Sequence, residues 1–134
     1  MVHLISITTT KFDATREPPN PINPIAGHGL LSWLREELRK VGWDVTEPDA
    51  EDWGWYVYAQ KSGASYLVGA SGELGNGIPP TDWIIQIHKN RKFIEKLTGK
   101  NQMADDDLLA REIETIVRRD ASATRIGVEI EKHA

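Results

Sequence analysis

The feature that most constrains the fold of this chain is an alternation of apolar and polar residues with a period of two. Such a period is typical of β-strands that bury one face and expose the other. Three segments have it: Trp53–Gln60, Asp82–Asn90 and Thr124–Lys132. One side of these strands is predicted to face a core and carries Trp53, Trp55, Val57, Ala59, Trp83, Ile85, Ile87, Ile126, Val128 and Ile130. The opposite side is predicted to carry Tyr56, Tyr58, Gln60, Ile84, Gln86, His88, Arg125, Gly127, Glu129 and Glu131.

Two amphipathic helices are predicted to cover the apolar side of these strands. The apolar residues of the first helix fall in a stripe about 100° wide. These residues are Leu30, Leu31, Leu34, Leu38 and Val41. The second helix begins at the acidic run Asp105–Asp107, whose side chains suit the exposed amides and the positive end of a helix. It ends at Arg118 and Arg119, which carry the complementary charge.

The remaining segments predict shorter elements and two loops. Val2–Thr8 is rich in β-branched residues and predicts a strand. Lys11–Gly29 contains four prolines, which exclude a helix interior or a central strand, so a long loop is expected there. Ser65–Ala70 predicts a strand, and Ser71–Thr81 predicts a second loop with a turn at Asn76-Gly77. A short helix is expected at Lys92–Thr98, ended by Gly99.

The order of these elements, β-α-β-β-β-(α)-α-β, indicates an α+β fold. Successive strands with short connections favour a single antiparallel sheet of about five strands, with both main helices on one face. At 134 residues the chain matches the usual size of one domain and shows no internal repeat. Residues 1–134 are therefore predicted to form a single α+β domain.

Composition narrows the class of protein. Apolar residues make up 40% and charged residues 27% of the chain, as expected for a globular domain that folds unaided. The chain has no cysteine, which excludes disulfides, thiolate-bound metal and a cysteine nucleophile and fits a reducing compartment. No apolar run is long enough for a signal sequence or a membrane span, so we expect a cytoplasmic protein with no membrane partner.

The charge of the chain is negative overall and unevenly distributed. The formal net charge of −4 argues against a nucleic-acid partner, because phosphate binding needs a concentrated basic face. Trp43–Ala59 contains five acids and no base, whereas Ile85–Lys100 contains five bases against Glu95. A polarised surface of this kind favours docking to a protein partner, and solvated loops and helix faces are the alternative explanation.

Sequence motifs for catalysis, metals and cofactors are missing. The four histidines, His3, His28, His88 and His133, are scattered, so no metal site is predicted. The chain has no Gly-x-Ser-x-Gly nucleophile turn and no complete glycine motif for a phosphate or a dinucleotide. The sequence therefore predicts no cofactor and argues against an enzyme.

Three groups of residues are candidates for binding. Gly27-His28-Gly29 precedes the first helix, where free amides could hold an anion and His28 could transfer a proton; loop flexibility is the alternative. Asp49, Glu51 and Asp52 could bind a cation or a basic partner, or could form a solvated turn. The predicted polar sheet face carries side chains of the kind used in small-ligand and protein interfaces, unless cross-strand packing alone accounts for them. They are Tyr56, Tyr58, Gln86 and His88.

One segment resembles a group of small bacterial proteins. The most specific part of the resemblance is Glu51-Asp52-Trp53-Gly54-Trp55-Tyr56, and the similar region covers residues 30 to 130, including the strand at Trp83 and the helix near Leu108. The resemblance implies a bacterial, single-domain protein. It implies no activity, and it transfers no catalytic or ligand residue.

These observations favour a non-catalytic protein-interaction or regulatory domain, such as an immunity protein. The alternative is a small-molecule-binding protein or a modest enzyme that uses His88, Tyr56 or Tyr58 in a cleft. The loops Lys11–Gly29 and Ser71–Thr81 would border that cleft. The sequence leaves open whether the protein forms homo-oligomers and whether its proline-rich loop is ordered.

Overall fold

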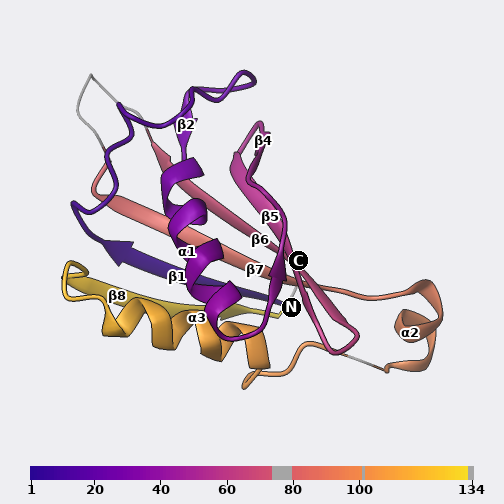
Figure 1. Cartoon of the computed structure of the whole chain (residues 1–134). Coiled ribbons are helices and arrows are strands. Elements are labelled where there is room, and N and C mark those ends of the chain that lie inside the picture. Colours follow the sequence, from indigo (N-terminus) through magenta and orange to yellow (C-terminus); the bar gives the residue numbers. More distant parts are fainter. Residues whose placement is uncertain (74–79, 101, 133–134) are drawn as a thin grey trace.

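The computed structural model describes residues 1–73, 80–100 and 102–132, which form eight strands and three helices (Figure 1). The helices are α1 (His28–Lys40), α2 (Phe93–Thr98) and α3 (Leu108–Arg119). The strands are β1 (Val2–Thr8), β2 (Ile25–Ala26), β3 (Asp44–Val45), β4 (Asp49–Glu51), β5 (Gly54–Lys61), β6 (Ala64–Glu73), β7 (Asp82–Asn90) and β8 (Arg125–Glu131).

All the strands belong to one open antiparallel sheet, so the predicted α+β class is confirmed. The main path runs β3-β5-β6-β7-β1-β8, while β2 pairs with β6 and β4 pairs with β5. The expected number of about five strands is wrong, because β2, β3 and β4 lie in segments predicted as loop or turn. These strands span only two or three residues, too few to produce a recognisable alternation in the sequence.

Helices α1 and α3 lie side by side on one face of the sheet (Figure 1). The core between them and the sheet contains the predicted leucine stripe of α1, with Leu30, Leu31 and Leu38 fully buried. It also contains the predicted apolar side of β7, since Trp83, Ile85 and Ile87 have no exposed surface. Val41, placed by the sequence in the α1 stripe, instead follows the end of the helix and is 38% exposed.

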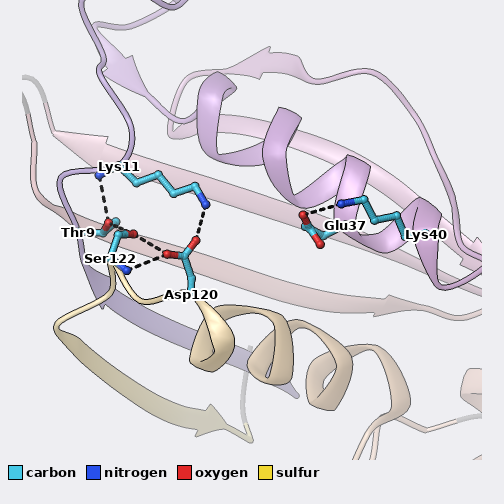
Figure 2. A network of polar contacts seen from close by, with 6 residues as sticks. All are labelled: Thr9, Lys11, Glu37, Lys40, Asp120 and Ser122. Carbon is cyan, nitrogen blue, oxygen red and sulfur yellow. Dashed lines mark hydrogen bonds and ion pairs between the residues drawn. The ribbon is translucent and has the colours of Figure 1, made fainter.

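The proline-rich segment is an ordered loop that is anchored at its start and near its middle. Near its start, Lys11 forms an ion pair with Asp120, and the Thr9 hydroxyl lies 2.8 Å from that of Ser122 (Figure 2). Further along, the amide of Asn20 donates to the carbonyl oxygens of Glu51 and Gly54 at 3.0 and 2.9 Å. The loop is therefore fastened to the β4–β5 hairpin at one place and to the α3–β8 connection at another.

Helix α3 begins as the sequence predicts, at the end of the run of three aspartates. Asp107 is the N-cap, and its carboxylate accepts hydrogen bonds from the amides of Leu109 and Ala110 at 3.0 and 3.1 Å. It also accepts a 2.7 Å bond from the hydroxyl of Tyr66, a buried residue of β6. Burial, and secondly this bond, raise the pKa of Tyr66, so the hydroxyl remains a donor at neutral pH.

The second predicted loop is shorter than expected. Strand β6 continues through Ser71 to Glu73, so the loop does not begin at Ser71. The predicted turn at Asn76-Gly77 lies outside the described residues. The short helix before Gly99 is confirmed as α2, and Gly99 adopts the left-handed conformation that ends it. No helix in the described part of the chain has both the length and the apolar character needed to cross a membrane.

Candidate functional site

The candidate site is the uncovered face, by which we mean the side of the sheet that is turned away from α1 and α3. Two rows of paired residues lie on it between β5 and β8. The first row contains Tyr56, Gly69, Gln86, Leu4 and Glu129. The second row contains Tyr58, Leu67 and His88, and the pair of Val2 and Glu131 lies on the same face at the other side of the sheet. The structure thus brings together four residues that the sequence proposed for this face: Tyr56, Tyr58, Gln86 and His88.

Three aromatic rings form a continuous line on this face. The rings of Tyr56 and Tyr58 lie 5.5 Å apart at an angle of 74°, and Trp53 follows at 6.5 Å from Tyr56. We call Trp53, Tyr56 and Tyr58 the aromatic strip. Tyr58 is 47% exposed, whereas Tyr56 is partly buried between its neighbours. Large rings that remain accessible on a flat surface are typical of protein-binding sites.

The position of Trp53 corrects the sequence prediction, which placed it beside Trp55 in the core. Trp53 lies in the turn between β4 and β5, and its ring rests on Gly69 of the uncovered face. A Cβ atom at Gly69 would lie 2.5 Å from a carbon of that ring, so the glycine makes room for it. Gly54, the first residue of β5, has a φ of 150°, a backbone conformation that residues with a side chain rarely adopt. Trp55 is buried as predicted.

Asp49 of β4 borders the aromatic strip and contacts it directly. The hydroxyl of Tyr56 donates a long hydrogen bond of 3.4 Å to the Asp49 carboxylate. Partial loss of hydration raises the pKa of Tyr56, and the negative charge of Asp49 raises it further. Tyr56 is therefore a neutral hydrogen-bonding group at physiological pH.

His88 and Gln86 form a polar pair beside the strip. Nε2 of His88 lies 2.9 Å from the Oε1 oxygen of Gln86, an arrangement in which the histidine nitrogen donates. Burial lowers the pKa of His88, and the positively charged N-terminal amino group lowers it further. The ring is consequently neutral at pH 7 and adds no positive charge to the face.

The strands of the uncovered face are strongly acidic. Strand pairing places seven carboxylates on this side of the sheet: Asp44, Asp49, Glu51, Glu73, Asp82, Glu129 and Glu131. Arg125 is the one cation that the described strands add to it. Asp52, the third acid of the predicted cluster, is exposed in the turn beside Trp53. The expected solvated turn is therefore met in part: Asp52 lies in the turn, whereas Asp49 and Glu51 belong to the hairpin strand β4.

The predicted anion site at Gly27-His28-Gly29 is occupied by the protein itself. The Glu17 carboxylate accepts hydrogen bonds from the backbone amides of Gly27 and Gly29, at 2.8 and 3.0 Å, and a longer one from that of His28. An internal carboxylate thus caps α1 and leaves these amides unavailable to a ligand. The ring of His28 packs edge-on against Trp55 at 5.0 Å, on the opposite side of the sheet from His88.

Two surface depressions of the described structure include residues of the uncovered face, and neither is lined by Gln86 or His88. One, of about 730 Å³, lies at the far end of β7 and is lined by Ser71, Asp82 and Ile84, but not by Tyr56 or His88. Another includes Tyr58 together with Arg35 and Arg39 at the β3 edge. The described residues contain no cluster of three or more metal-ligating side chains.

No protein-family model, no curated protein and no solved structure matches the chain. The site therefore rests on geometry. Sequence reasoning missed the position of Trp53 on this face and three of its acids, Asp44, Glu73 and Asp82. Gly54 was the available signal for Trp53, because a glycine between two tryptophans permits a turn where a strand was expected.

Proposed function

We propose that this protein is a non-catalytic interaction protein, of a regulatory or immunity-like kind, that binds the basic surface of a protein partner on its uncovered sheet face. The observation that carries the proposal is the combination of the aromatic strip with seven strand carboxylates and a single arginine. Aromatic faces and carboxylates together suit Lys and Arg side chains, through cation–π contacts and ion pairs.

A protein partner fits this face better than a nucleic acid or a small molecule. Aromatic rings can stack on bases, but phosphates would meet the carboxylates of Asp49 and Glu51 at the same place. Small ligands bind in concave sites, and neither of these two depressions is lined by Gln86 or His88. A flat aromatic surface with an acidic surround is the arrangement of a protein interface.

The first test uses a defined probe, a short peptide of alternating arginine and glycine. Its binding to the ¹⁵N-labelled protein is followed by chemical-shift changes, with a glutamate–glycine peptide of equal length as the control. We expect the arginine peptide to shift the amides around Tyr56 and Tyr58 and the indole N–H of Trp53. Shifts confined to the helices, or equal shifts with both peptides, would contradict the proposal.

Matched variants separate the aromatic strip from general acidity. Tyr58→Ser removes an exposed ring, and Glu51→Gln removes a charge from the face, whereas Glu36→Gln removes the same charge from the exposed side of α1. We expect the first two to weaken peptide binding about threefold to tenfold, corresponding to contacts of about 1 kcal/mol each. Glu36→Gln should leave binding unchanged. Equal weakening by Glu51→Gln and Glu36→Gln would mean that only net charge matters.

The natural partner is sought by photo-crosslinking from the face itself. A benzophenone amino acid replaces Tyr58 in one variant and Leu108 in a second, because Leu108 is also exposed but lies at the start of α3. We expect a protein with a basic surface to crosslink at position 58 and not at position 108, and the yield of that crosslink to fall when Glu51→Gln is added. Crosslinking from both positions alike would contradict the assigned face.

A further inference from the structure

Strand β8 forms one edge of the sheet and is unusually open for an edge. It pairs with β1 on one side, and among the described residues no strand pairs with its other side. Its seven residues, Arg125–Glu131, include no lysine and no proline, and its three charged side chains, Arg125, Glu129 and Glu131, all lie on the uncovered face. The opposite edge, β3, is only two residues long. The free edge of β8 is thus a long row of backbone donors and acceptors available for pairing.

The backbone geometry identifies which residues of β8 offer these groups. The amide of Thr9 donates to Thr81 at 2.8 Å, so odd-numbered residues along β1 direct their backbone groups toward β7 and even-numbered ones toward β8. The bond from the amide of Thr124 to the carbonyl of Thr8, also 2.8 Å, agrees with this alternation. Arg125, Gly127, Glu129 and Glu131 therefore face β1, and the outward groups belong to Ile126, Val128 and Ile130.

The sequence of β8 is complementary to itself when it is reversed about Val128. In that antiparallel register Val128 faces Val128, Ile126 faces Ile130, and Arg125 faces Glu131 at both ends. Ile126, Val128 and Ile130 direct their backbone groups away from β1, and in this register they face one another across the two β8 strands. Three such residue pairs, with two hydrogen bonds each, give about six hydrogen bonds. Val128 is 42% exposed although its side chain lies on the helix-covered side of the sheet, and Ile126 and Ile130 are only partly buried. The sequence prediction that all three enter the core is thus only partly met, because none of the described helices and strands covers this edge fully.

We propose that the protein forms a two-fold homodimer in which β8 pairs antiparallel with β8 of a second copy, centred on Val128. The two sheets become one, with the four main helices on the same side. On the uncovered face, Arg125 of each copy pairs with Glu131 of the other at the two ends of the interface. On the helix-covered face, Val128 and its neighbouring isoleucines pack against those of the second copy. The inference is independent of the proposed function and leaves both aromatic strips accessible on one continuous face.

A charge exchange tests the register. We expect the wild-type chain to sediment as a dimer over a concentration series reaching about 0.3 mM. Arg125→Glu should weaken the dimer by about tenfold or more, because both end pairs become like-charged. The double variant Arg125→Glu with Glu131→Arg should restore it, whereas Arg125→Glu with Glu129→Arg should not. The proposal would be overturned if the wild-type chain is a monomer at all concentrations. It would also be overturned if Arg125→Glu with Glu131→Arg fails to restore the dimer.

Disulfide capture tests the contact at the axis. Opposed residues in such a hydrogen-bonded pair have Cα atoms about 5.5 Å apart, a distance that a disulfide spans. Because the chain has no cysteine, Val128→Cys gives one thiol per copy. We expect mild oxidation to produce a covalent dimer, while Tyr58→Cys, at a residue of similar exposure, stays mostly monomeric. Equal capture of both variants would overturn the assignment of the interface.

A proline variant separates dimerisation from folding. The amide of Val128 points away from β1, so Val128→Pro should remove the dimer while the circular dichroism spectrum stays that of the folded chain. Glu129→Pro removes an amide directed at β1 and should destabilise the monomer itself. If Val128→Pro remains a dimer with unchanged affinity, β8 is not the interface.

Discussion

The buried contact between Asp107 and Tyr66 gives the sharpest test of the packing described above. Asp107 is only 5% exposed, and its carboxylate accepts three hydrogen bonds, two from the first amides of α3 and one from the Tyr66 hydroxyl. Replacing it by alanine removes the cap of α3. It also leaves a fully buried hydroxyl without its acceptor. The variant Asp107→Ala should therefore destabilise the protein more than an ordinary cap substitution does.

The magnitude follows from these two losses. A lost N-cap side chain costs about 1 kcal/mol, and a buried hydroxyl without a partner costs about 2 kcal/mol, so Asp107→Ala should lower the free energy of unfolding by about 3 kcal/mol. Tyr66→Phe removes only the hydroxyl and should lower it by about 1.5 kcal/mol, because the cap remains. In the double variant no hydroxyl is left unpaired. Its destabilisation should fall short of the sum of the two single effects by about 2 kcal/mol, the cost of the unpaired hydroxyl.

The assay is urea unfolding followed by circular dichroism at neutral pH, with all four chains measured at one concentration. Asp106→Ala is the matched control, because Asp106 is exposed next to the cap and should change the stability by less than about 0.5 kcal/mol. The urea concentration at the midpoint of unfolding should fall in the destabilised variants. The slope of the unfolding free energy against urea concentration should stay the same. The reasoning is refuted if Asp107→Ala behaves like Asp106→Ala, or if the effects of the two single variants are additive.

Three further predictions follow from other contacts. The hydrogen bond from Lys11, and secondly those from Ser122, hold the pKa of Asp120 at about 2, so Asp120 stabilises the fold above pH 4 and loses that effect as the pH falls toward 2. The stability difference between the wild type and Asp120→Asn should therefore shrink by about 1–2 kcal/mol between pH 5 and pH 2; a constant difference would contradict the ion pair. Glu17→Ala should lower the free energy of unfolding by about 1–2 kcal/mol by uncapping α1, and an effect no larger than that of exposed Glu36→Ala would argue against the cap. Gly69→Ala should displace the Trp53 ring and red-shift the tryptophan emission, a shift that should disappear in a Trp53→Phe background if the assigned contact is right.

Local patterns in the sequence were sufficient for much of the fold. The alternation in Asp82–Asn90 sorted Trp83 and His88 onto opposite faces, and the apolar stripe of α1 identified Leu30 and Leu38 as core residues. The aspartate run located the start of α3. These predictions succeeded because strand and helix periodicities are properties of neighbouring residues and need no knowledge of the partner segment. For the same reason the placement of Tyr56, Tyr58 and Gln86 on one face could be predicted.

Only the tertiary structure decided which of these faces is covered and which groups are already satisfied. The Glu17 carboxylate accepts a hydrogen bond from the amide of Gly27 before α1, the Trp53 ring packs on Gly69, and the Tyr66 hydroxyl donates to Asp107. Each contact joins segments that are distant in the sequence. The open edge of β8 likewise depends on the order of strands in the sheet. A periodic pattern records which side chains share a face. It does not record what packs against that face, because the free energy of burial and hydrogen bonding belongs to both partners of a contact.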